Sequence, residues 1–270
     1  MNSPDPSSRI AVRALTREFG AARAVDRLDL DIGAGEIFGI VGRNGAGKTT
    51  TVKMLTTLLP PTSGTALVGG YDIRTQAPQV RRIIGYVPQA LSADGELTGY
   101  ENLLVFARLF DIPRAERHRR IAEALAFMEL TEAADRLVRS YSGGMIRRLE
   151  IAQSTLHRPQ VLFLDEPTVG LDPLARHAVW GHVAKLNAEY GTTVVLTTHY
   201  MDEAEALCRR IAVMHKGALV AADTPQALKA RLGPDASLDD VFAHFTGGSP
   251  EGDGRYADIA TIRTTAGRLG

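Results

Sequence analysis

A glycine-rich segment at residues 42–50 carries the residue types that bind phosphate. It reads Gly-Arg-Asn-Gly-Ala-Gly-Lys-Thr-Thr and follows the apolar run 37–41. The glycines let successive N–H groups point into one cavity at the start of a helix, whose dipole favours negative charge. Lys48 would then bridge the β- and γ-phosphates of a nucleotide, and the Thr49 hydroxyl would bind Mg²⁺. A structural turn with a solvated lysine is the alternative, but a strand before the segment and a helix after it favour a phosphate loop.

Two carboxylates end a second apolar run, residues 161–164. Asp165 lies where nucleotide hydrolases place the acid that orients Mg²⁺. Strand alternation would point Glu166 away from Asp165, so that it faces a water molecule at the γ-phosphate. The alternative, that the pair only caps the following turn, is less consistent with the phosphate loop upstream.

Further polar and aromatic positions are ambiguous from residue type alone. Ser142, Gly143 and Gly144 precede a predicted helix, where they form either an ordinary N-cap or a second anion site. Gln89 follows the predicted strand 83–87, at the end of an α/β sheet where ligands bind. Phe19, placed in a loop between two strands, is either a core residue, which its residue type alone favours, or a ring on which adenine stacks.

Composition limits the class of protein. The 270 residues are enough for one large domain or two small ones, and 31 basic residues balance 31 acidic ones, which argues against a nucleic-acid partner. One cysteine, Cys208, indicates a reducing compartment and a buried position. No run approaches the eighteen apolar residues of a membrane helix, so we expect any membrane role to come through a partner.

Hydrophobic patterns predict an α/β fold with two additions. Strands alternate over residues 10–32, which predicts an antiparallel sheet ahead of a parallel core. Residues 92–157 lack strand signals and predict a helical insertion, with a basic cluster at 114–120 that its interleaved acids mark as a solvated face. The other predicted elements are helices at 50–59, 173–189, 201–209, 225–231 and 238–245 and strands at 65–68, 193–197, 211–214 and 218–220. A leader at 1–8 and a tail at 246–270 are expected to be disordered.

Together these motifs resemble those of the ATP-binding cassette ATPases, in the same order and spacing. The resemblance runs from about residue 10 to residue 245 and rests on the segments 42–50, 141–145, 161–166 and 170–173 with Gln89 and His199. The family's common signature begins with leucine and ends with glutamine, where this chain has Tyr141 and Met145. That variant, with the following Ile-Arg-Arg-Leu-Glu-Ile-Ala and the later Leu-Asp-Asp-Val-Phe at 238–242, is similar to the daunorubicin-resistance type of drug-export ATPase.

The resemblance implies a P-loop NTPase core, an antiparallel β subdomain, a helical subdomain at about 92–157, and ATP with Mg²⁺ as cofactors. Glu166 would be the general base, His199 and Lys48 would contact the γ-phosphate, and Thr49, Gln89 and Asp165 would serve the metal. Phe19 would stack on adenine. The remaining implied nucleotide contacts are Gly42, Asn44, Gly45, Ala46, Gly47, Thr50, Ser142, Gly143, Gly144 and Asp172, the last four reaching across a dimer interface.

The partner and cargo follow only from this resemblance. It implies an ATP-bound homodimer at the cytoplasmic face of a membrane, docked on a separate permease of the ABC-2 type and powering export of a drug-like or lipid-like substrate. Two alternatives stay open. One is a non-transport cassette acting on nucleic acid, ribosomes or assembly; the other is a P-loop kinase, which would have no need for Ser142–Gly144 or Asp172.

Overall fold

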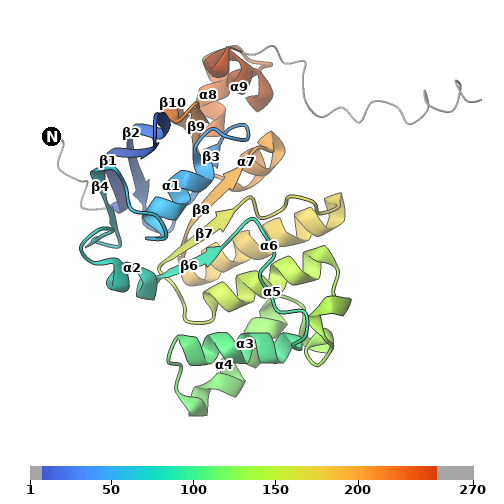
Figure 1. The fold of residues 1–270 in the computed structure, drawn as a ribbon. Helices are drawn as coiled ribbons and strands as arrows, with labels where there is room; N and C mark the ends of the chain where they lie inside the picture. Colours follow the sequence, from blue (N-terminus) through green and yellow to red (C-terminus); the bar gives the residue numbers. More distant parts are fainter. Residues whose placement is uncertain (1–7, 248–270) are drawn as a thin grey trace, which may run out of the picture.

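Two β-sheets and the helices around them make up residues 8–247, the part of the chain that the computed structural model describes (Figure 1). Residues 1–7 and 248–270 lie outside it, and with them nearly all of the expected leader and tail. No helix within residues 8–247 is both long enough and apolar enough to cross a bilayer.

The first sheet is antiparallel, as predicted, and has the strand order β2-β1-β4-β5. Its strands are β1 (Ser8–Phe19), β2 (Ala22–Gly33), β4 (Ser63–Val68) and β5 (Tyr71–Asp72). Strand β1 begins one residue inside the expected leader. The loop position predicted for Phe19 is wrong, because Phe19 pairs with Ala22 and ends β1.

The second sheet is the core, with the order β10-β9-β3-β8-β7-β6. Strands β9 (Arg210–His215), β3 (Ile37–Val41), β8 (Thr193–Thr198), β7 (Val161–Asp165) and β6 (Ile84–Val87) run parallel, and β10 (Ala218–Asp223) is antiparallel to β9. Every residue of β3, β7 and β8 is buried, as expected for strands covered on both faces. Val41 pairs with Thr198 and Asp165 with Thr197, so the carboxyl ends of these three strands share one edge.

Apart from α2, the helices around the core sheet follow the predicted order. They are α1 (Lys48–Leu55), α2 (Ala77–Ile83), α6 (Pro173–Tyr190), α7 (Met201–Leu207), α8 (Pro225–Ala230) and α9 (Leu238–Thr246). Helix α2 was not predicted, because the sequence patterns assigned no element to residues 77–82 and placed Ile83 in a strand.

Helix α1 begins at Lys48 instead of residue 50, and the predicted ends of two helices are wrong for identifiable reasons. Helix α1 stops at Leu55 instead of residue 59, because Thr57 has a left-handed φ of 64° and the next two N–H groups turn back to the Lys53 carbonyl. Helix α7 stops at Leu207 instead of residue 209, because the Arg209 N–H donates to the Ile37 carbonyl and the chain enters β9. Cys208 is buried there as expected, and a Cβ at Gly39 would lie 2.8 Å from its Sγ.

Between β6 and β7 the chain forms a group of helices, drawn in green at the bottom of Figure 1. It contains α3 (Gly99–Leu109), α4 (Arg114–Phe127), α5 (Gly143–Thr155) and two 3₁₀ turns, η1 (Thr131–Ala133) and η2 (Val138–Ser140). The predicted stripe of Ile121, Leu125 and Met128 is buried. Arginines of the basic cluster on α4 form ion pairs within the helix, Arg119 with Glu123 and Arg120 with Glu116.

His157, which follows α5, generates a prediction about acid stability. Its ring stacks on Phe110 with centroids 3.8 Å apart, and its Nε2 lies 3.0 Å from the Ile84 carbonyl oxygen. Burial lowers its pKa from 6.5 to about 4, so the unfolded chain binds this proton more tightly than the folded one. Stability should therefore fall as pH drops from 6.5 to 4.

The measurement is urea unfolding at pH 7, 5.5 and 4 for the native chain and for His157→Gln, whose amide also reaches a carbonyl. Carboxylates titrate in both proteins, so the imidazole accounts for the difference between them. The native chain should lose about 1–3 kcal/mol more than the variant over this range. Equal losses in the two proteins would contradict the assignment.

Candidate functional site

The phosphate loop lies between β3 and α1 and is held by close backbone packing. Gly47 caps α1 with φ of 103°, and a Cβ there would lie 2.5 Å from the Ala24 carbonyl oxygen of β2. A Cβ at Gly42 would lie 2.6 Å from the Met214 carbonyl oxygen of β9. Glycine is required at both positions, because any side chain would push neighbouring strands away.

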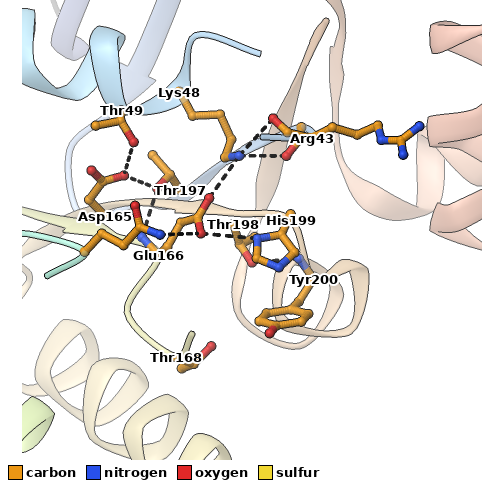
Figure 2. Close-up of polar contacts among 12 residues, drawn as sticks. Arg43, Lys48, Thr49, Asp165, Glu166, Thr168, Thr197, Thr198, His199 and Tyr200 are labelled. Atoms are coloured by element: carbon orange, nitrogen blue, oxygen red, sulfur yellow. Dashed lines mark hydrogen bonds and ion pairs between the residues drawn. The ribbon is translucent and has the colours of Figure 1, made fainter. Parts of the chain in front are cut away.

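Lys48 is buried inside this loop and is 4% exposed. Its Nζ donates to the carbonyl oxygens of Gly42 at 2.7 Å and Arg43 at 3.2 Å, and lies 3.1 Å from Glu166 Oε1 (Figure 2). A buried ammonium needs such partners to offset its lost hydration. The lysine is thereby fixed between the phosphate loop and Glu166.

Asp165, at the end of β7, is linked to the phosphate helix. Its Oδ1 accepts hydrogen bonds from Thr49 Oγ1 at 3.0 Å and from Thr197 Oγ1 at 2.6 Å (Figure 2). Thr197 was not predicted as a site residue. The signal that could have found it is its place at the carboxyl end of a buried strand, where the parallel register sets it opposite Asp165.

Glu166 faces away from Asp165, as predicted, but not for the predicted reason. Strand β7 ends at Asp165, and Glu166 takes a left-handed backbone conformation with φ of 49°. Its N–H donates to the Thr197 carbonyl oxygen at 3.1 Å and lies 3.0 Å from Thr197 Oγ1, which holds this conformation in place. Backbone strain at a non-glycine residue is often found at functional sites.

Three predicted site residues converge on the Glu166 carboxylate. Lys48 Nζ lies near Oε1, and His199 Nδ1 lies 3.3 Å from Oε2 (Figure 2). Gln89 Nε2 also lies 3.3 Å from Oε2. Glu166 is 4% exposed, whereas Gln89 lies on the surface and His199 is half-buried. The carboxylate is thus sheltered on one side and reachable from the other, which suits a group that accepts a proton from a bound water.

Glu203 is a buried acid that the sequence reasoning missed. It lies in the first turn of α7, is fully buried, and its Oε1 accepts from Thr168 Oγ1 and Trp180 Nε1, both at 2.8 Å. Burial raises the pKa of Glu203, and hydrogen bonds with Thr198, Thr168 and Trp180 lower it by a smaller amount. Through Thr168, Glu203 is linked to the segment after Glu166, and through Thr198 it is linked to the end of β8, just before His199. Its sequence position indicated only a favourable helix-dipole charge.

The predicted second anion site lies at the start of α5. Ser142 caps the helix by accepting from the Met145 N–H at 3.3 Å, and both Ser142 and Gly143 are exposed. A Cβ on Gly144 would lie 2.9 Å from Ala175 Cβ, so glycine lets α5 approach α6. Asp172 caps α6 through the Ala175 N–H at 2.9 Å. The structure therefore brings Ser142–Gly144 and Asp172 side by side on two helix starts.

The other predicted nucleotide contacts lie at the surface or against the loop. Asn44 and Gly45 are exposed, Ala46 is buried, and Thr50 is half-buried in α1. Phe19 is 49% exposed, so it is not a core residue, and the Arg17 guanidinium lies 4.6 Å from its ring centre. Its strand partner Ala22 is two residues from Ala24, which packs on Gly47, so the ring belongs to a hairpin beside the phosphate loop.

The pairing of Thr49 with Asp165 fits a divalent cation. A hydroxyl and a carboxylate oxygen 3.0 Å apart, next to the phosphate loop, are hard oxygen donors of the kind that Mg²⁺ prefers alongside phosphate oxygens. The amide oxygen of Gln89 belongs to the same chemical class.

Two glycines of the phosphate loop allow a prediction in which one variant is the control for the other. Gly47→Ala places a Cβ against the Ala24 carbonyl oxygen at an unfavourable φ, whereas Gly45→Ala has a positive φ of 80° but meets no atom within 4 Å. We expect Gly47→Ala to lower the free energy of unfolding by at least about 2 kcal/mol and Gly45→Ala by about 1 kcal/mol. Chemical unfolding without nucleotide measures both, and equal losses would contradict the packing argument.

Comparisons with known proteins agree with the nucleotide-binding site described above. Residues 25–169 match the family model described as ABC transporter. The chain is 48% identical to the daunorubicin/doxorubicin resistance ATP-binding protein DrrA of Streptomyces peucetius, over 84% of this chain and 69% of that one. It is 43% identical to DrrA2 of Streptomyces coeruleorubidus, over 95% and 84% of the two chains. With the linearmycin resistance ATP-binding protein LnrL of Bacillus subtilis it shares 39% identity, over 83% and 72%.

Solved structures give the same family. An ATP-binding subunit of an ABC transporter superposes with a TM-score of 0.78 at 29% identity, covering 88% of this chain and 99% of that one. The cassette MJ0796, described as a dimeric post-hydrolysis state bound to ADP and Pi, superposes with a TM-score of 0.72 at 27% identity, covering 80% and 98%. The phosphate loop, the paired carboxylates and these likenesses show that the chain belongs to the ATP-binding cassette family and is an ABC-type ATPase.

Proposed function

We propose that the chain is the ATP-hydrolysing subunit of an exporter, and that the residues around Glu166 carry out the hydrolysis. The observation that supports this most directly is the convergence of Lys48, Gln89 and His199 on the Glu166 carboxylate, next to the hydrogen-bonded Asp165 and Thr49. In this proposal the N–H groups of residues 42–50 bind the α- and β-phosphates. Phe19 stacks on adenine, for which its exposed ring is suited.

Thr49, Asp165 and Gln89 would hold Mg²⁺, which neutralises charge on the β- and γ-phosphate oxygens. Lys48 contacts the same oxygens and gives up its contact with Glu166 when a phosphate offers it a stronger partner. Glu166 then accepts a proton from the water that attacks the γ-phosphate. His199, 3.3 Å from Glu166 Oε2, orients that carboxylate and donates to the γ-phosphate.

Two copies would close around two ATP molecules. Each γ-phosphate is bound by the loop of one chain and by the Ser142–Gly144 site of the other, with Asp172 at the shared surface. The exposed Ser142 and Gly143, and the solved cassette dimer with ADP and Pi, support this arrangement. Hydrolysis removes the group that both chains bind, so the closed state loses the contacts that favoured it and the dimer opens.

The first test is Glu166→Gln. The amide retains the shape of the side chain but cannot take up a proton, so ATP hydrolysis should fall by about a hundredfold or more. Because the nucleotide is not consumed, an ATP-bound dimer should accumulate. Steady-state phosphate release and size-exclusion chromatography with ATP and Mg²⁺ measure the two effects.

Glu132→Gln is the matched control. Glu132 is an exposed carboxylate in η1, and this variant should hydrolyse ATP at the native rate and should not accumulate a dimer. Normal turnover by Glu166→Gln would refute its role as general base. A phosphorylated small molecule in place of ADP and free phosphate would instead support the P-loop kinase alternative.

The permease and the cargo are inferred from the relatives. They are named for resistance to daunorubicin, doxorubicin and linearmycin, so we propose a drug-like or lipid-like cargo. The resemblance to drug-export ATPases supports a separate permease of the ABC-2 type. These names favour transport over a non-transport cassette acting on nucleic acid, ribosomes or assembly. The ATPase would then lie at the cytoplasmic face of the membrane, bound through its permease.

Exposed apolar side chains after Gln89 and on α3 are our candidates for permease docking. Leu91, two residues after Gln89, is 53% exposed, and Val105 and Leu109, one turn apart on α3, are 50% and 69% exposed. Exposed apolar side chains suit a protein partner, and Leu91 is joined through the chain to Gln89, which contacts Glu166.

The docking prediction compares two variants made in cells that contain the permease. Val105→Glu with Leu109→Glu should abolish co-purification with membranes while leaving the ATPase rate of the isolated chain unchanged. Leu58→Glu, at a 59% exposed leucine just after α1, should bind membranes like the native chain. Retention of the double variant at native levels would show that the permease docks elsewhere.

A further inference from the structure

Two buried side chains of α5 attach the loop that carries Gln89. Arg147 and Glu150 are each 2% exposed, and Arg147 Nη1 lies 3.0 Å from Glu150 Oε2. Such a pair is costly to desolvate and is tolerated only where its hydrogen-bonding groups find partners. Outside the pair itself, the hydrogen-bond partners of both side chains belong to residues 88–93, while Arg147 Nε and Glu150 Oε2 make no hydrogen bond.

The contacts hold the loop at both ends. Arg147 donates through Nη1 to the Pro88 carbonyl oxygen at 2.7 Å and through Nη2 to the Gln89 carbonyl oxygen at 2.8 Å. Glu150 Oε1 accepts from Ser92 Oγ at 3.1 Å, from the Ala93 N–H at 3.3 Å and from the Ser92 N–H. The planar guanidinium suits the first pair of contacts, because its fork matches two adjacent carbonyls as a lysine cannot.

The same helix begins at the second anion site. Ser142 caps α5, five residues before Arg147, and the Gln89 side chain held by this loop reaches Glu166 Oε2 at 3.3 Å. A helix moves along its axis as a rigid body, and a buried ion pair that is hydrogen-bonded to both ends of a loop makes that loop follow the helix. A shift of Ser142–Gly144 would therefore move the backbone of Gln89.

We propose that Arg147 and Glu150 are positioning residues that make the Gln89 loop and α5 one moving unit. Through them, the placement of Gln89 beside the general base of one chain is coupled to the placement of the anion site that this chain offers to the γ-phosphate of its partner. The inference rests on the proposed ATP-bound dimer and adds the link between its two sites.

A conservative variant tests the attachment without nucleotide. Deleting either partner would leave a buried charge alone and could unfold the chain, so we choose Arg147→Lys, with Glu150→Gln as a second variant. The Ser92 and Ala93 N–H groups should exchange with deuterium at least about tenfold faster in both. Arg148→Lys is the control, because Arg148 lies on the same helix but donates to the Met128 carbonyl oxygen instead. Native exchange rates in the Arg147 and Glu150 variants would overturn the proposal.

Kinetics separate positioning from general stability. If Arg147 acts through Gln89, Arg147→Lys should lower kcat about fivefold or more with less than about a twofold change in KM for ATP. Adding it to Gln89→Ala should then cost nothing further, because the residue it positions is already gone. Losses that multiply in the double variant would contradict the link.

Dimerisation distinguishes failure of this inference from failure of the proposed function. In the Glu166→Gln background, Arg147→Lys should weaken the ATP-dependent dimer about tenfold by analytical ultracentrifugation, while Arg148→Lys should not. If Glu166→Gln alone never dimerises with ATP and Mg²⁺, the proposed function fails, whatever the exchange data show. If it dimerises and Arg147→Lys leaves that affinity unchanged, the coupling fails and the function stands.

Discussion

The parallel pairing of β3, β8 and β7 is the constraint on which the site depends. These strands are buried along their whole length, and their register sets Val41 against Thr198 and Thr197 against Asp165. A slip of two residues in either pairing would separate the phosphate loop from Asp165 or from His199 while still burying an apolar strand. The polar residues placed at one edge, above all the hydrogen-bonded Thr197 and Asp165, penalise such a slip because they would lose their partners.

The backbone conformation of Glu166 directs its carboxylate into the site at the sheet edge. Its φ of 49° ends β7 and turns its carboxylate toward Lys48, Gln89 and His199. Such a conformation costs about 1–3 kcal/mol and is stable only if the surroundings hold it. The two contacts from its N–H to Thr197 and the buried network of Glu203, Thr168 and Trp180 just beyond it do so.

The sequence predicted what depends on local pattern. The phosphate loop, the antiparallel sheet, the buried strands of the core and the approximate position of each helix except α2 and α3 followed from periodicity and from glycine or proline signals. What could not be predicted depends on contacts between distant segments. The early end of α1, the left-handed Glu166 and the buried Arg147, Glu150 and Glu203 are set by neighbours far along the chain, and a charged residue in a helical pattern ordinarily indicates a solvated face. Residue type alone favoured a core position for Phe19; only the family resemblance favoured the exposed ring that the structure shows.

Cys208 has a practical consequence. It is the only cysteine of the chain, it is buried against Gly39, and burial raises the pKa of its thiol. Thiol reagents attack the thiolate, so in the folded protein this sulfur is inert at neutral pH. The native chain is therefore already a suitable background for spectroscopic labelling: a single cysteine introduced on its surface would carry a fluorophore or a spin label without removal of the natural one.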